Sequence, residues 1–311
     1  MTPDHNNMLR LHGRAGLLCL LCAIFPWAQA AQGLGVCQFD ATLAQFRGAP
    51  VEQARCLLRH VEPHGSVRPA PASLPLSLEA LIDQPTGDLQ SMLPRLLRDL
   101  GVRAHDLGGV LDAKLSAAAD NRPARYFVIH DTSWPWLGEA AFPPDDSFPL
   151  NDLKPFSGRY GSAHVFVNRL GRTATTHAFS EPWRATKLEM KSDESVAKGR
   201  FLHIELLQPR RRDPAGPAGN DALAPSPGFT GAQYERLALL YVLASARSGR
   251  WLIPAFHGAM DDGLPGAHDD PQNFDLLPFV DAVMALRERL SDPPLAEQAP
   301  DPGLEESATI R

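Results

Sequence analysis

The stretch RYFVIH, residues 125–130, marks the point at which the character of this chain changes. It is a short, largely apolar run that ends in a histidine, and the loop-type residues DTS (131–133) follow it. Similar short runs recur downstream together with one long helix, and this pattern predicts an α/β domain. The expected strands are Arg125 to His130, Ala163 to Arg169, Thr173 to His177, Phe201 to Leu207 and Trp251 to His257.

The clearest single element is a helix expected from Gly231 to Ser248. Thr230 has the position of an N-cap, Gln233 completes a capping box with it, and Gly249 provides the C-terminal stop. A closing helix is expected from Pro278 to Leu290. With the strands, these helices place the main domain at residues 123–290.

The residues that precede this domain have a different pattern. Residues 51–61 carry apolar side chains at helical spacing, and residues 89–100 form a second amphipathic stretch. A proline-rich connector, residues 67–75, lies between them. We therefore expect residues 31–122 to form a small helical region that packs on the main domain or simply precedes it.

The N-terminal 30 residues have the three parts of a secretory signal peptide. Arg10 and Arg14 are followed by the apolar run 15–26 and by the small-x-small sequence AQA at 28–30. An uncleaved membrane anchor is the alternative, but the run is shorter than the roughly 20 residues that span a bilayer. We expect cleavage after Ala30 and a mature protein that is periplasmic or secreted, without stable membrane insertion.

Cysteine usage is consistent with export. Cys19 and Cys22 lie within the expected signal peptide, so the mature chain keeps the pair Cys37 and Cys56. A disulfide between them is plausible in an oxidising compartment, and two buried free thiols are the alternative.

The net charge bears on the class of partner, and the composition of two stretches bears on their order. The formal net charge of −6 suggests neither nucleic acid nor an anionic membrane surface as a partner. Residues 209–227 are rich in Pro, Gly and Ala and are expected to form a loop, while the acidic tail 291–311 is expected to be disordered. The oligomeric state is left open.

Two histidines stand at the ends of expected strands. His130 and His257 each close an apolar run and precede a loop. Either residue alone would more often be structural. Two in the same kind of position favour a shared metal, because neutral imidazole is the commonest zinc ligand.

Glu205 lies within FLHIELL (201–207), a run otherwise apolar enough for a central strand. A carboxylate there is unfavourable unless it faces a polar cavity, although an edge strand with Glu205 in water is the alternative. Alternation places Glu205 and His203 on one face. A glutamate beside a metal-activated water would be a suitable general base.

The loop 257–271 could return one carboxylate to the metal that His257 binds, or it could be a set of solvated turns. The spacing does not choose between Asp261, Asp262, Asp269 and Asp270.

The order of these motifs resembles a known family. VIHDT (128–132), SAHVFVNRLGRT (162–173), HIEL (203–206), FTGAQYERLALL (229–240), FHG (256–258) and HDDP (268–271) together resemble the zinc-dependent N-acetylmuramoyl-L-alanine amidases of the amidase-2 family, which includes the peptidoglycan recognition proteins. The resemblance covers residues 125 to about 290. It implies a mixed central β-sheet flanked by helices, with the helical region 31–122 as an N-terminal extension.

The resemblance also implies a site. The zinc ligands would be His130, His257 and Asp270, since the third family ligand stands just before a proline, and the general base would be Glu205. Many members carry a lysine two positions before the third ligand, where this chain has His268, and the resemblance implies that an imidazole N–H of His268 donates to the oxyanion instead. His164 and His203 are candidates for orienting these groups, with core packing as the alternative.

The implied activity is hydrolysis of the amide bond between N-acetylmuramic acid and L-alanine in peptidoglycan, with Zn²⁺ as cofactor and peptidoglycan or muropeptides as substrate. Two other readings stay open: a catalytically inactive peptidoglycan-binding receptor, and a zinc peptidase that cuts within the stem peptide. The sequence does not distinguish intact sacculus from soluble muropeptides, nor does it give the physiological role.

Overall fold

The structure is a computed structural model that describes residues 33–156, 162–217 and 221–291. The expected signal peptide and all but the first residue of the expected tail lie outside the described residues. The described residues belong to one compact unit. Among them, no helix combines the length and the apolar character needed to cross a membrane.

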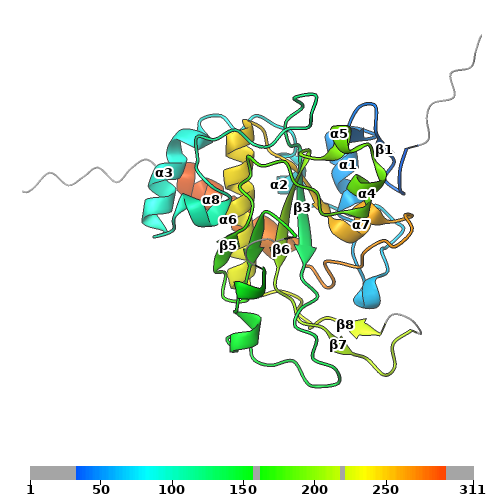
Figure 1. The fold of residues 1–311 in the computed structure, drawn as a ribbon. Helices are drawn as coiled ribbons and strands as arrows, with labels where there is room; N and C mark the ends of the chain where they lie inside the picture. The colour runs from blue at the N-terminus through cyan, green and yellow to red at the C-terminus, as the bar shows by residue number, and fades with distance from the viewer. Residues whose placement is uncertain (1–32, 157–161, 218–220, 292–311) are drawn as a thin grey trace, which may run out of the picture. The chain divides into compact units, whose positions relative to one another are not determined.

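The centre of the fold is a mixed five-stranded sheet in the order β5-β4-β6-β3-β9 (Figure 1). Strands β4, β6, β3 and β9 are parallel, and β5 pairs antiparallel with β4 at one edge. The strands of the sheet are β3 (Tyr126–Asp131), β4 (Val165–Val167), β5 (Thr173–Thr175), β6 (Phe201–Leu206) and β9 (Ile253–Phe256). The predicted α/β class with a mixed, helix-flanked sheet is confirmed.

The remaining elements lie around this sheet. The helices are α1 (Pro50–Leu57), α2 (Leu76–Glu79), α3 (Leu89–Asp99), α4 (Lys187–Lys191), α5 (Glu194–Ala197), α6 (Gly231–Ser248), α7 (His257–Asp261) and α8 (Leu276–Ser291). Two short strand pairs are β1 (Phe39–Asp40) with β2 (Gln45–Phe46) and β7 (Arg211–Arg212) with β8 (Ala222–Leu223).

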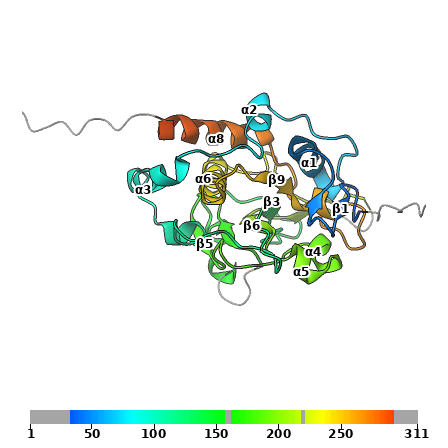
Figure 2. The same cartoon turned by 90° about the horizontal axis from the view of Figure 1, so that it is seen from above.

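One face of the sheet is covered by α6, which packs against α8 (Figure 2). The capping box of Thr230 and Gln233 forms as predicted, and Gly249 ends the helix in the left-handed conformation. Phe127 of β3 points to this side, with its ring 5.2 Å from that of Tyr241 on α6. Because side chains alternate along a strand, Tyr126 points to the opposite face.

That opposite face is covered by residues 33–60, here called the N-terminal segment. The Tyr126 ring stacks on Phe201 at 5.0 Å and meets Phe46 edge-on at 5.3 Å. The Tyr126 hydroxyl accepts a hydrogen bond from the Phe46 N–H and donates one to Gln53 on α1. These contacts join the N-terminal segment to the core of the sheet.

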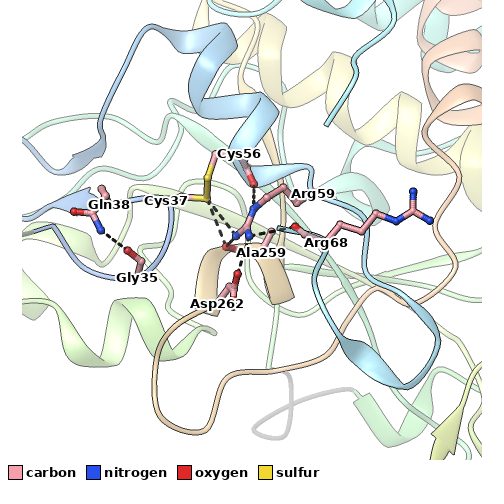
Figure 3. Close-up of a disulfide and its surroundings, with 8 residues drawn as sticks. All are labelled: Gly35, Cys37, Gln38, Cys56, Arg59, Arg68, Ala259 and Asp262. Atoms are coloured by element: carbon pink, nitrogen blue, oxygen red, sulfur yellow. Dashed lines mark hydrogen bonds and ion pairs between the residues drawn. A yellow bond between two sulfur atoms is a disulfide. The ribbon is translucent and has the colours of Figure 1, made fainter. Parts of the chain in front are cut away.

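A disulfide between Cys37 and Cys56 closes this segment, as the cysteine count suggested (Figure 3). Arg59 lies beside the disulfide, buried, with Nη1 2.7 Å from Oδ2 of Asp262. Its guanidinium also donates to the carbonyls of Cys56 and Ala259. The N-terminal segment is therefore attached directly to α7 and the residue after it.

Three local predictions were wrong. The helical pattern at 51–61 gives a helix only to Leu57, preceded by the β1–β2 hairpin; Pro50, favourable in the first helical turn, sets its start. The expected strand 251–257 ends at Phe256, because His257 already begins α7. The expected loop 209–227 contains the β7–β8 pair, which a Pro- and Gly-rich composition does not reveal.

Candidate metal centre

The site lies at the carboxyl ends of three adjacent parallel strands. His130 is near the end of β3, directly opposite Glu205 of β6 in the register of the two strands. His257 follows the last residue of β9, the other neighbour of β3. Parallel pairing thus brings three side chains that are far apart in the sequence to the carboxyl-terminal end of the sheet. Glu205 lies on a central strand, so the edge-strand alternative is wrong.

Two imidazoles and one carboxylate converge there. Nδ1 of His130 lies 2.9 Å from Nδ1 of His257, which lies 3.0 Å from Oδ1 of Asp270. Oδ2 of Asp270 lies 3.8 Å from Nδ1 of His130. All three residues are buried, and these ligand atoms lie within 4.8 Å of one another, so the group could hold a metal ion. The donor set of two imidazole nitrogens and one carboxylate is one that zinc takes in hydrolytic sites.

Asp270 is held in place by the chain around it. Its Oδ2 accepts a hydrogen bond from the Asp131 N–H, and its carbonyl accepts one from the Gly258 N–H. The Asp131 carboxylate in turn accepts hydrogen bonds from the buried guanidinium of Arg210 and from the Gln272 N–H. The residue after the first histidine therefore fixes the loop that carries the third candidate ligand.

Glu205 is a buried carboxylate with little to stabilise its charge. It is 8% exposed, and within the described part of the chain its Oε2 has no hydrogen-bond partner. Its Oε1 lies 4.0 Å from Nδ1 of His130. Burial, and next the charge of Asp270, raise its pKa well above the ordinary value. An unpaired buried carboxylate is costly for stability, which points to a role in chemistry.

The four aspartates that the spacing left open have different surroundings, and both Asp270 and Asp261 belong to groups that could hold a metal ion. Asp270 joins the two histidines, whereas Asp262 pairs with Arg59 and Asp269 accepts from the Gln272 side chain. Asp261 is fully buried and accepts hydrogen bonds from the N–H groups of Lys187 and Leu188 at the start of α4. Its Oδ2 lies 3.0 Å from Nε2 of His257, on the far side of that ring from Asp270.

His268 lies at the rim of the site. Its side chain is 45% exposed, its ring centroid is 4.3 Å from that of His257, and its Nδ1 is 3.1 Å from Oδ2 of Asp261. The last contact leaves Nε2 as the ring nitrogen available to a substrate. A role as oxyanion donor remains a prediction.

The two other candidate histidines have different surroundings. Nδ1 of His203 lies 3.0 Å from Nε2 of His130, so His203 contacts a candidate ligand directly. His164 accepts from the His203 backbone N–H, and its Nε2 bonds the Glu181 carbonyl. His164 is therefore a hydrogen-bonded core residue.

Sequence reasoning missed Glu189. This fully buried residue of α4 contacts Nε2 of His203 at 3.2 Å through Oε2. Thr186 and Glu189 have the spacing of a capping box, so the start of α4 could have been found from the sequence. The contact with His203 could not, because it depends on how α4 packs on the sheet.

The two histidines differ electrostatically. Burial, and next the neighbouring His257, hold the pKa of His130 well below its ordinary value, which keeps it neutral. Burial also lowers the pKa of His257, but the Asp270 and Asp261 carboxylates outweigh it and raise that pKa above the ordinary value. The carboxylates around His257 thus concentrate negative charge where a cation would bind.

No model of a protein family matches this chain, and no curated protein matches it. Among solved structures, the chain is similar to the crystal structure of a selenomethionine derivative of AmpD, with 20% sequence identity and a TM-score of 0.31. The match covers 57% of this chain and 98% of that one. A likeness at this TM-score does not bear on function.

Proposed function

We propose that this protein is a zinc-dependent N-acetylmuramoyl-L-alanine amidase, in which His130, His257 and Asp270 hold the metal. The single observation that carries the proposal is the cluster of these three ligand atoms beside the unpaired buried carboxylate of Glu205. Zinc bound there would supply Lewis-acid chemistry, polarising the scissile carbonyl and acidifying water.

In this proposal Glu205 is the general base. Its raised pKa suits a group that must accept a proton near neutral pH and release it again. It takes a proton from water as the water oxygen forms a bond to the carbonyl carbon. It then gives that proton to the alanine nitrogen as the carbon–nitrogen bond breaks. Because Nδ1 of His268 faces the Asp261 carboxylate, His268 would donate Nε2–H to the carbonyl oxygen, as negative charge develops there, with protons on both ring nitrogens.

The substrate class rests on the sequence motifs. The ordered motifs from VIHDT to HDDP resemble the amidase-2 family, and the residues that carry ligand and base roles in that family are the ones that converge here. We also propose export to the periplasm or the exterior, where peptidoglycan lies, on the pattern of residues 8–30.

Mass spectrometry of purified sacculi digested with the zinc-loaded protein tests the proposal. The expected products are glycan strands with free lactyl groups and intact stem peptides. Stems shortened from within would instead indicate a zinc peptidase, and binding to sacculi without any product would indicate a receptor. Either of those results would overturn the amidase assignment.

A further inference from the structure

A line of three buried side chains leads from the candidate metal centre to helix α4. Nε2 of His130 lies 3.0 Å from Nδ1 of His203, and Nε2 of His203 makes a hydrogen bond of 3.4 Å with Oε1 of Glu189. His203 and Glu189 are both fully buried, and His130 is 1% exposed. Water therefore does not compete for these contacts, and each proton must lie between two protein atoms.

Glu189 determines which atoms donate and which accept hydrogen bonds along this line of side chains. An ionised carboxylate only accepts hydrogen bonds, so Nε2 of His203 must carry a proton and donate it to Glu189. With that single ring proton, His203 has a lone pair on Nδ1, which accepts from Nε2–H of His130. Neutral His130 is left with its lone pair on Nδ1, the nitrogen that faces His257 and Asp270.

Glu189 is itself firmly anchored. Its Oε2 accepts hydrogen bonds from the N–H groups of Ala185 and Thr186 and from the Thr186 hydroxyl. These three donors occupy Oε2, which also lies 3.2 Å from Nε2 of His203, while the hydrogen bond from His203 goes to Oε1 at 3.4 Å. The carboxylate therefore has a fixed orientation that a freely rotating surface glutamate would lack.

We propose that Glu189 is a positioning residue that, through His203, sets the tautomer of His130 so that Nδ1 offers its lone pair to the metal. The inference rests on the proposed metal site and deepens it. Hydrogen-bonded outer groups of this kind orient imidazole ligands, and their loss typically lowers metal affinity about 10- to 100-fold.

Glu189→Gln should reverse the direction of the hydrogen bonds along this line, while the side chain at position 189 keeps nearly the same size. The Gln oxygen will take the position of Oε2, where three donors need an acceptor, and its NH₂ group will face His203. His203 must then accept on Nε2 and donate from Nδ1. His130 is forced to accept on Nε2 and to carry its proton on Nδ1, where a metal must bind.

Two measurements on the full-length protein test this. Imidazole ¹⁵N NMR without added metal should show Nε2–H for His130 in the wild type and Nδ1–H in Glu189→Gln, with the signal assigned by its loss in His130→Ala. Zinc titration against a chromophoric chelator should show an affinity about 10- to 100-fold lower in Glu189→Gln. The control is Glu181→Gln, whose carboxylate is 57% exposed and contacts His177 instead; it should change neither readout.

His203→Asn separates this role from simple packing. The Asn oxygen can replace Nδ1 of His203 as the acceptor for His130, but the shorter side chain does not transmit the state of residue 189. In that background, Glu189→Gln should leave zinc affinity unchanged. An equal loss of affinity in both backgrounds, or an unchanged His130 tautomer in Glu189→Gln, would overturn the inference. Failure of the wild type to bind zinc would instead count against the proposed function, and the tautomer measurement would still decide the role of Glu189.

Discussion

At the scale of single residues, a substitution of Glu205 can distinguish metal binding from catalysis. Its carboxylate lies beside the candidate ligands, 4.0 Å from the nearest of their ring nitrogens. Glu205→Gln keeps the size of the side chain and removes the base. We expect retained zinc binding and fold with turnover reduced roughly 10²- to 10⁴-fold, the usual contribution of a general base. Turnover on sacculi and zinc content, measured on the same preparation, check this; near-normal turnover would exclude Glu205 from the mechanism.

Two adjacent aspartates provide a matched pair at the same scale. Asp270 lies 3.0 Å from His257, whereas Asp269 contacts the side chain of Gln272. Asp270→Ala should lose most of the zinc, and Asp269→Ala should keep it, because only the first removes a ligand atom. Metal analysis after dialysis measures both. The reverse result would mean that the third ligand is one residue earlier than we infer.

At the scale of elements, the Thr230 hydroxyl caps the N-terminus of α6. The Thr230 hydroxyl accepts from the Gln233 N–H at 3.1 Å and donates to the Arg169 carbonyl at 2.7 Å. Thr230→Ala removes both bonds and should lower the free energy of unfolding by about 1 kcal/mol, a typical loss for an N-cap. Urea denaturation measures this, with Thr230→Ser as the control that keeps the hydroxyl. Equal stability of the alanine and serine variants would contradict the assigned cap.

At the scale of the whole molecule, Tyr126 connects the N-terminal segment to the sheet. Its hydroxyl bonds the Phe46 N–H and the Gln53 side chain in a buried position. Tyr126→Phe leaves two buried polar groups without this partner, and we expect a loss of about 1–3 kcal/mol in unfolding free energy at neutral pH. Denaturation at pH 7 measures this loss.

The same residue predicts a pH dependence. Burial raises the pKa of Tyr126 from 10.0 to about 12. Between these values the unfolded chain loses the phenolic proton while the folded protein keeps it, so stability is complete below pH 10 and falls as the pH rises to about 12. Tyr126→Phe lacks this contribution and should lose stability less steeply over that interval. Urea midpoints at pH 9, 10 and 11 compare the two proteins, and parallel declines would show that Tyr126 does not contribute.

The sequence alone determined the elements whose signals are local. The strand expected at 125–130 and the capped helix α6 were predicted from periodicity and capping residues, and a disulfide between Cys37 and Cys56 was plausible from a count of two cysteines. These features depend on neighbours within one element, or on there being a single possible partner. A resemblance in motif order added the choice of Asp270, which spacing had left open.

Tertiary structure decided the relations between elements. His130 meets His257 across 127 residues and Asp131 meets Asp270 across 139, distances over which no sequence pattern carries register. The position of α4 in the fold gave His203 its partner Glu189, and the docking of the N-terminal segment gave Tyr126 its buried contacts. Parallel strand pairing and helix packing create these contacts between residues far apart in the sequence. The local sequence around one residue of such a pair does not indicate which residue will be its partner.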